Sequence, residues 1–251
     1  GHYISPIKVP FMPDLQTSAR LYSEVYRPCS FFWEPQSYCT FMSVPLFYSL
    51  IDKKYLWTVM IVLSMFLSTS TTGIAISFLS ILTYVLTQKV SNINKIMIII
   101  TGVALLYFLM TSDMFSASVN KVESTSYEHS SRLYNGPTFV ANMNKKDLLL
   151  GINFASAYDY YVAGNVKAYL FEKHDTIFVP SFWNVLVKFG IVGAFLFLAI
   201  YVESFCRCRK LCVYVIPLIV ALFTNPDYLG GLFSFEFIII YSFINHENKS
   251  I

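Results

Sequence analysis

Residues 182–202, FWNVLVKFGIVGAFLFLAIYV, decide which kind of fold this chain can adopt. A helix needs about 20 residues to cross the hydrocarbon core of a bilayer. This run reaches that length with a single charged residue, Lys188. Lys188 lies close to one end, where its long side chain can extend to the membrane interface. The stretch therefore predicts a membrane-spanning helix.

Further apolar runs repeat this pattern along the chain. They lie at 38–51, 55–67, 74–87, 96–111, 211–224 and 229–244. Several of them reach the length of a span only with polar flanking residues, and 74–87 and 229–244 could instead be re-entrant segments. We expect an all-α integral membrane protein, in which the helices form a multi-spanning bundle with the lipid bilayer as solvent.

The composition points to the same class. The 251 residues are 55% hydrophobic and only 13% charged, with a mean hydropathy of +0.54. A soluble domain carries about 25% charged residues, and a disordered chain is poor in apolar ones. The net charge of +3 is too small to indicate a polyanion, so we expect no nucleic-acid partner.

Basic residues occur in every second short connection. Lys or Arg is present in 52–54, 89–95, 203–210 and the tail 245–251, and absent from 68–73 and 225–231. Cytoplasmic loops of membrane proteins carry such an excess of Lys and Arg. The alternation predicts that the basic connections face the cytoplasm and that 1–37 and 112–181 lie outside.

These segments define the expected organisation. We expect 1–251 to be a single polytopic membrane domain, with 1–37 as an external segment and 112–181 as a large external loop. Because 1–37 is polar and lacks a signal-peptide pattern, we also expect the chain to be the C-terminal part of a longer protein.

The loop 112–181 is rich in Tyr and Phe, which predicts a partly helical cap rather than a linker. Thr125-x-x-Glu128 resembles a capping box that opens a helix, and Gly136-Pro137 should kink or end that helix. Lys145, Lys146 and Asp147 should form a solvated turn before LLLGINF.

The external regions contain the candidate binding residues. Arg27 and Arg132 carry guanidinium groups that match pyrophosphate bidentately, although either could pair with a nearby glutamate instead. His129 and His174 could act as general bases, or could be ordinary surface residues. Rings beside a carboxylate are typical of sugar-binding surfaces and also of an interfacial aromatic belt. Such a group is formed by Tyr158, Asp159, Tyr160 and Tyr161.

Several motifs, taken in order, resemble the O-antigen polymerase (Wzy) family. RPCSFFWEPQSY at 27–38 and MFLSTSTTGIAISFL at 65–79 are similar to two of its segments. Arg132, LLLGINF at 148–154 and NVLVKFGIVGAFLFL at 184–198 resemble the large-loop pattern of the wider superfamily of O-antigen polymerases and ligases. The resemblance covers about 27–200.

This resemblance implies a membrane-embedded, inverting glycosyltransferase that needs neither metal nor other cofactor. Its substrate would be an undecaprenyl-pyrophosphate-linked oligosaccharide at the outer face of the bacterial inner membrane, and a chain-length regulator protein is a candidate partner. Arg27 and Arg132 would then hold the pyrophosphate, and the base would be His174, Glu34 or His129. The alternatives are an O-antigen ligase and, with less support, a lipid-linked sugar flippase or transporter.

Overall fold

The structure is a computed structural model that describes most of the predicted helices. The described residues are 20–22, 25–27, 35–68, 70–89, 91–111, 134–152, 179–224 and 238–245, of which 20–22, 25–27, 105–106 and 108–110 are described by their backbone alone. The chain divides into a first unit, Gly1–Ser124 with Arg209–Ala221, and a second unit, Thr125–Cys208 with Leu222–Ile251.

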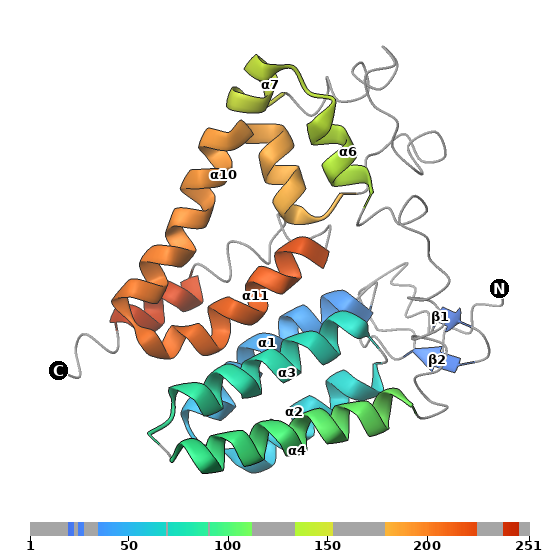
Figure 1. Ribbon diagram of the computed structural model, residues 1–251, viewed down its shortest axis with the longest axis vertical. Coiled ribbons are helices and arrows are strands. Elements are labelled where there is room, and N and C mark those ends of the chain that lie inside the picture. Colours follow the sequence, from blue (N-terminus) through green and yellow to red (C-terminus); the bar gives the residue numbers. More distant parts are fainter. Residues whose placement is uncertain are drawn as a thin grey trace, which may run out of the picture. The chain divides into compact units, whose positions relative to one another are not determined.

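The first unit is built from helices that reverse direction at short connections (Figure 1). Its described elements are β1 (Arg20–Tyr22), β2 (Val25–Arg27), α1 (Pro35–Ile51), α2 (Tyr55–Leu67), α3 (Thr71–Thr87), α4 (Asn92–Met110), the 3-10 turn η2 (Arg209–Leu211) and the greater part of α11 (Cys212–Thr224). The strands β1 and β2 pair antiparallel. Helix α1 packs against both α2 and α3, and α4 lies against α3.

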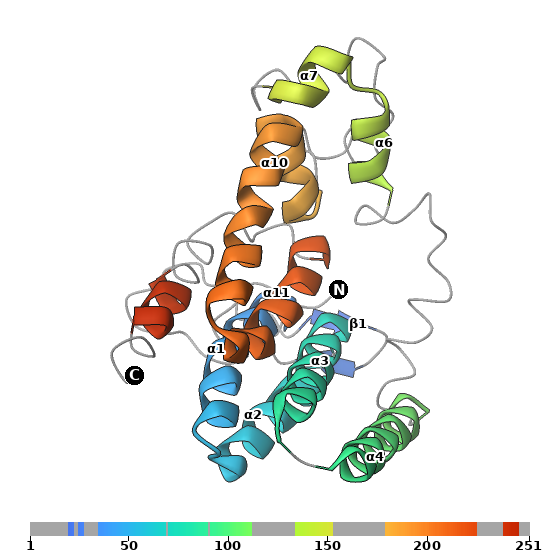
Figure 2. The same cartoon turned by 60° about the vertical axis from the view of Figure 1, so that its left-hand side comes forward.

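The second unit contains a long helix with two short helices packed on its first part (Figure 2). Its described elements are α6 (Asn135–Ala141), α7 (Lys145–Leu150), α10 (Ser181–Arg207), the end of α11 and the helical residues 238–245. Phe139, Met143, Ile152, Val179 and Val187 form a buried apolar cluster, in which α6 and the chain after α7 meet α10.

The predicted helical class is confirmed for the described residues, with the short β1–β2 pair as the exception. Helices α1, α2, α3, α4, α10 and α11 each cover one of the apolar runs, and 238–245 covers the end of the last run. Within the described residues, α10 alone is both long and apolar enough to cross a membrane. Helices α2 and α3 are apolar but shorter. The multi-spanning bundle therefore stays a prediction.

One local prediction in the loop is wrong, and another is not tested. Gly136 and Pro137 lie in the first turn of α6, and the helix that they were expected to kink or end would lie at residues outside the described part of the chain. Proline suits a first turn, because its missing N–H would have no partner inside the helix there. The expected turn at Lys145–Asp147 is instead the start of α7, which follows Asn144. Asp147 favours this helix, since a carboxylate in the first turn interacts well with the helix dipole.

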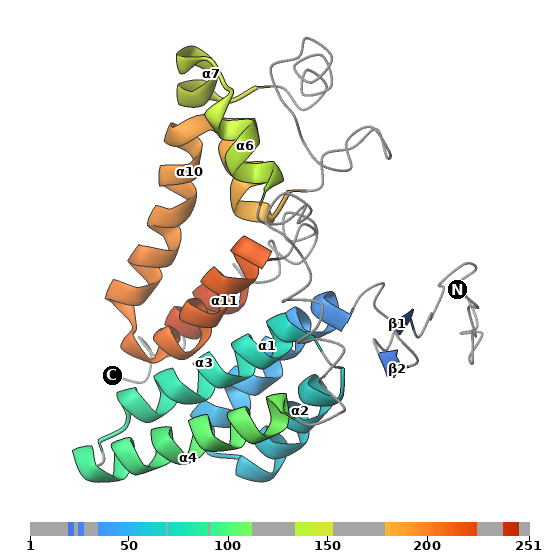
Figure 3. The same cartoon turned by 45° about the vertical axis from the view of Figure 1, so that its right-hand side comes forward.

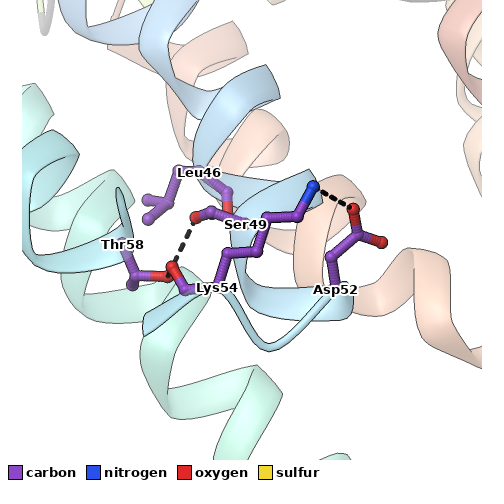
Figure 4. Close-up of polar contacts among 5 residues, drawn as sticks. All are labelled: Leu46, Ser49, Asp52, Lys54 and Thr58. Atoms are coloured by element: carbon purple, nitrogen blue, oxygen red, sulfur yellow. Dashed lines mark hydrogen bonds and ion pairs between the residues drawn. The ribbon is translucent and has the colours of Figure 1, made fainter. Parts of the chain in front are cut away.

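Small hydroxyl side chains fill the interior between α1, α2 and α3. Those less than 9% exposed are Ser37, Thr40, Ser43, Ser49, Thr58, Ser68, Ser70, Thr72, Ser77, Ser80 and Thr83. Several bond to a carbonyl one turn earlier; Thr40 Oγ1, for example, donates to Gln36 O at 3.0 Å. Thr58 Oγ1 also donates to Ser49 Oγ at 2.9 Å, which links α2 to α1 (Figure 4). Small polar residues at helix contacts let two backbones approach closely.

Large apolar side chains, in contrast, lie on the outside of the same unit. On α2, Leu56 is 74% exposed and Trp57 is 60% exposed, and on α4 Ile93 is 74% exposed. A domain in water buries such residues and exposes its hydroxyl groups. Along α2 and α4 several such residues are exposed, although others, such as Ile61 and Met65 on α2, are buried.

Helices α1 and α3 approach each other closely at Gly73. A Cβ added there would collide with Sγ and Cβ of Cys39. The Cys39 thiol is fully buried and lies 3.1 Å from the hydroxyl oxygen of Ser68, so it has little freedom to move aside. Gly73 therefore sets the distance between the two helices.

Gly73→Ala should destabilise the protein by about 1–3 kcal/mol, as overpacking of a filled interior usually does. The melting temperature of the purified full-length protein in detergent measures this effect. Cys39→Ala should restore part of the loss by removing the sulfur. Gly102→Ala on α4 is the matched control, because an added Cβ meets nothing within 4 Å there. Equal melting temperatures for the Gly73 and Gly102 variants would contradict the close contact.

Candidate functional site

Almost all the predicted site residues lie outside the described part of the chain. These are Glu34, His129, Arg132, Tyr158, Asp159, Tyr160, Tyr161 and His174. Arg27 is described by its backbone, which ends β2 and pairs in register with Arg20 of β1. Their roles stay predictions. The described residues show how the segments next to them in the sequence are held in place.

Two of the motif segments meet at one end of the first unit. The segment that ends in EPQSY begins α1, and the segment STSTTG joins α2 to α3. Tyr38 OH donates to Ser64 Oγ at 2.9 Å, and Cys39 lies against Ser68. These contacts fix the start of α1 to the end of α2. They thereby hold the first turn of α1, which begins at Pro35.

The serines of the connection between α2 and α3 bond to its own backbone. Ser68 Oγ donates to Met65 O at 2.6 Å and accepts from Ser70 N at 3.4 Å. Ser70 is the N-cap of α3, and its Oγ accepts from Gly73 N at 3.3 Å. An N-cap of this kind stabilises a helix by about 1 kcal/mol. These hydroxyls therefore hold the backbone in place, which is a positioning role rather than a chemical one.

The second unit contains a break in its long helix. Gly190 has φ 66° and ψ −171°, so α10 consists of two helical parts, 181–189 and 191–207. In an uninterrupted helix the carbonyl of Val187 would accept from the N–H of residue 191. Here it accepts from Ile152 N at 2.8 Å. The chain that follows α7 thus supplies a hydrogen bond at the break.

Glycine is required on both sides of this contact. Gly151 has φ 83°, and a Cβ there would collide with the Lys188 carbonyl. A Cβ on Gly190 would collide with the Leu149 carbonyl. The φ and ψ values of Gly190 belong to a region that is open essentially to glycine alone. The backbones of LLLG and KFG are therefore in direct contact, and the residues around Gly151 pack against the break in α10.

A second glycine contact fixes α6 on α10. A Cβ on Gly136 would collide with the indole of Trp183, so α6 lies directly on that ring. Next to it, the rings of Phe182 and Phe223 pack with centroids 4.5 Å apart. The two glycine contacts thus set the geometry of the described ends of the loop 112–181, at residues 134–152 and 179–181.

Sequence reasoning missed several buried polar residues. Gln36 is 4% exposed and Asn135 is 1% exposed. Asn184 Oδ1 is buried with no hydrogen-bond partner among the described residues. Asn184 interrupts an apolar run, and a polar residue at such a place indicates a buried polar side chain. Gln36 and Asn135 stand at helix starts, where the sequence alone does not distinguish a buried side chain from a solvated one.

The described residues include no group of three or more His, Cys, Asp or Glu side chains placed to hold a metal ion. Of their cysteines, Cys39 and Cys212 are buried, and Cys206 is exposed. The contacts between the motif segments are made by hydroxyl groups, a thiol and backbone groups. In the proposed site, the charged groups would come from residues outside these contacts.

Comparisons with protein-family models, with curated proteins and with solved structures found no match.

Gly190→Ala should lower the melting temperature of the purified protein and increase proteolysis of the second unit. The backbone strain alone costs about 1–3 kcal/mol, and the collision with the Leu149 carbonyl adds to it. Gly102→Ala again serves as the control. A Gly190→Ala protein that melts like wild type would mean that α10 runs through residue 190 without a break.

Proposed function

We propose that the chain is a multi-spanning membrane protein of the bacterial inner membrane that polymerises lipid-linked oligosaccharide repeat units into O-antigen or capsular polysaccharide. The membrane placement is supported by exposed side chains such as Leu56 and Trp57 on α2, by the buried hydroxyls behind them, and by the span-length helix α10. Exposed apolar surface of this extent is favourable in lipid and costly in water.

Helices shorter than a full span fit this placement when their polar ends are counted. Helix α1 has 17 residues, α3 has 17 and α4 has 19, and about 17 is the practical minimum for a crossing. Helix α2 has 13 residues, and the connections on either side of it would lie within the headgroup region. The basic connections 52–54, 89–95 and 203–210 would face the cytoplasm.

One observation carries the proposed activity. Segments that resemble O-antigen polymerases and ligases lie in contact in two places. The start of α1, at and directly after EPQSY, contacts the end of α2 and the STSTTG connection, and LLLG contacts KFG. The two members of each pair lie apart in the sequence. At each contact the chains come so close that a side chain in place of Gly73, Gly151 or Gly190 would collide with the partner segment. Such contacts give a structural reason for these segments to occur in one chain, and they support the proposal to that extent.

The chemistry would be glycosyl transfer with inversion. A hydroxyl of the acceptor sugar attacks the anomeric carbon of the donor chain, and a base removes its proton. The new carbon–oxygen bond forms as the bond to undecaprenyl pyrophosphate breaks. Negative charge develops on this leaving group, so fixed cations there lower the barrier. Arg27 and Arg132 would take that role, with His174, Glu34 or His129 as the base.

The sugar would be bound by other residues of the large periplasmic loop. Tyr158, Asp159, Tyr160 and Tyr161 offer rings that stack on pyranosides and a carboxylate that accepts from hydroxyls. No metal ion or cofactor enters this scheme. A chain-length regulator protein would be a partner in the membrane.

Deletion of the gene, followed by gel analysis of the surface polysaccharide, tests the proposal. A polymerase mutant should leave single repeat units on the lipid A–core. A ligase mutant should leave none and should accumulate long lipid-linked chains. A flippase mutant should accumulate single repeats at the cytoplasmic face. An unchanged polysaccharide ladder would reject all three functions.

Reporter fusions should place 89–95 and 203–210 in the cytoplasm and 112–181 outside. The physical reason is the preference of Lys and Arg for the cytoplasmic side. Paired alkaline phosphatase and green fluorescent protein fusions give opposite signals on the two sides. A cytoplasmic signal from a fusion next to Lys146 would overturn the topology and with it the site.

Arg27→Lys and Arg132→Lys should each reduce polymerisation by about tenfold or more. Lys keeps the charge but loses the planar pair of donors, and one hydrogen bond to a charged group contributes about 1.5–3 kcal/mol. The measurement is chain length at matched protein abundance. Arg20→Lys is the control, since Arg20 pairs in register with Arg27. If all three variants keep normal chain length, the arginines do not hold pyrophosphate.

A further inference from the structure

Four lysines gather at one end of the first unit. Helices α1 and α3 run in the same direction, so the α1–α2 and α3–α4 connections lie at the same end (Figures 1 and 3). The four are Lys53, Lys54, Lys89 and Lys95. At the opposite end, the described residues between α2 and α3 are Ser68 and Ser70. The described part of the unit is therefore cationic at one end, and its α2–α3 connection at the other end is uncharged.

Two of these lysines are engaged within the protein. Lys54 Nζ lies 3.2 Å from Asp52 Oδ2 across the α1–α2 turn (Figure 4). Lys95 Nζ donates to Leu86 O at 3.1 Å, near the end of α3. Lys53 and Lys89 are exposed, and their side chains have no hydrogen-bond or ion-pair partner among the described residues. They are the charges that remain available for a ligand.

Bare apolar surface begins directly next to these charges. On α2, Tyr55 is 56%, Leu56 is 74% and Trp57 is 60% exposed. On α4, Ile93 is 74% and Met97 is 59% exposed. The surface thus changes from cationic to aromatic and aliphatic within about one helical turn. A membrane interface has the same order, with basic residues among the headgroups, Tyr and Trp at their level, and aliphatic residues in the hydrocarbon.

We infer that this end of the first unit binds anionic phospholipid, with Lys53 and Lys89 contacting the headgroup phosphates. A soluble anion would satisfy the two charges but would leave Leu56, Trp57 and Ile93 in water. A phospholipid satisfies both, because its phosphate and its acyl chains lie at the depths where the lysines and the apolar side chains lie. The inference rests on membrane placement and is independent of the proposed glycosyl transfer.

The full-length protein in lipid vesicles provides the test. Brominated acyl chains quench tryptophan fluorescence on contact, so brominated phosphatidylglycerol is compared with brominated phosphatidylcholine at equal mole fraction. Wild type should be quenched more strongly by phosphatidylglycerol, and high salt should reduce the difference. Lys53→Asn with Lys89→Gln should lower the preference about fivefold for each lysine removed. Asn is chosen because Lys53 has φ 57°, which Asn tolerates.

Lys145→Gln with Lys146→Gln is the matched control, since it removes two exposed lysines from α7 in the second unit. It should keep the full preference. Equal quenching by the two lipids in wild type, or an equal loss in the control, would overturn the inference. Displacement of phosphatidylglycerol by millimolar inorganic phosphate would also overturn it. A normal polysaccharide ladder in the Lys53/Lys89 variant would leave the proposed function untouched.

Discussion

Close backbone contact, permitted by glycine and by small hydroxyl side chains, is the constraint on which both units depend. In the first unit Cys39 packs directly against Gly73, and the Cys39 thiol also contacts the hydroxyl of Ser68. In the second unit Gly151 and Gly190 bring two chain segments together, with Ile152 N bonded to Val187 O. Burial of large side chains drives association in water but gives little advantage in lipid, where tight packing and interhelical hydrogen bonds take its place.

The outward apolar faces accompany these contacts. Serine and threonine share the helix contacts with large residues such as Leu46 and Met65, and further large residues lie on the outside. Helix α2 illustrates this, because it buries Thr58 against Ser49 and exposes Leu56 and Trp57. The exposed apolar faces would be favourable in lipid, and they support the proposed bilayer placement.

The sequence predicted the helices well and the contacts between them poorly. Apolar runs have a length and a boundary, and α2, predicted at 55–67, has those bounds in the structure. A glycine contact has no such local signal, because Gly151 and Gly190 lie far apart in the chain and each resembles an ordinary turn or helix residue. Gly136-Pro137 shows a related difficulty, because such a dipeptide can end one helix or lie in the first turn of the next, as it does in α6. The predicted site residues, such as Arg132 and His174, lie outside the described residues.

The two ends of the first unit differ in a way that limits where glycosyl transfer could occur. The end that carries Lys53 and Lys89 would face the cytoplasm, whereas the lipid-linked substrate is expected at the other side. There the described groups at the start of α1 and between α2 and α3 are hydroxyls, an amide and a buried thiol, which can orient a sugar or a backbone but cannot neutralise a pyrophosphate. The cation must then come from the external segments. Arg27, which ends β2 shortly before α1, and Arg132, which precedes α6, stand at suitable positions in the chain for that role. In each unit the helices would provide a fixed frame, and catalysis would depend on an arginine in the segment next to that frame.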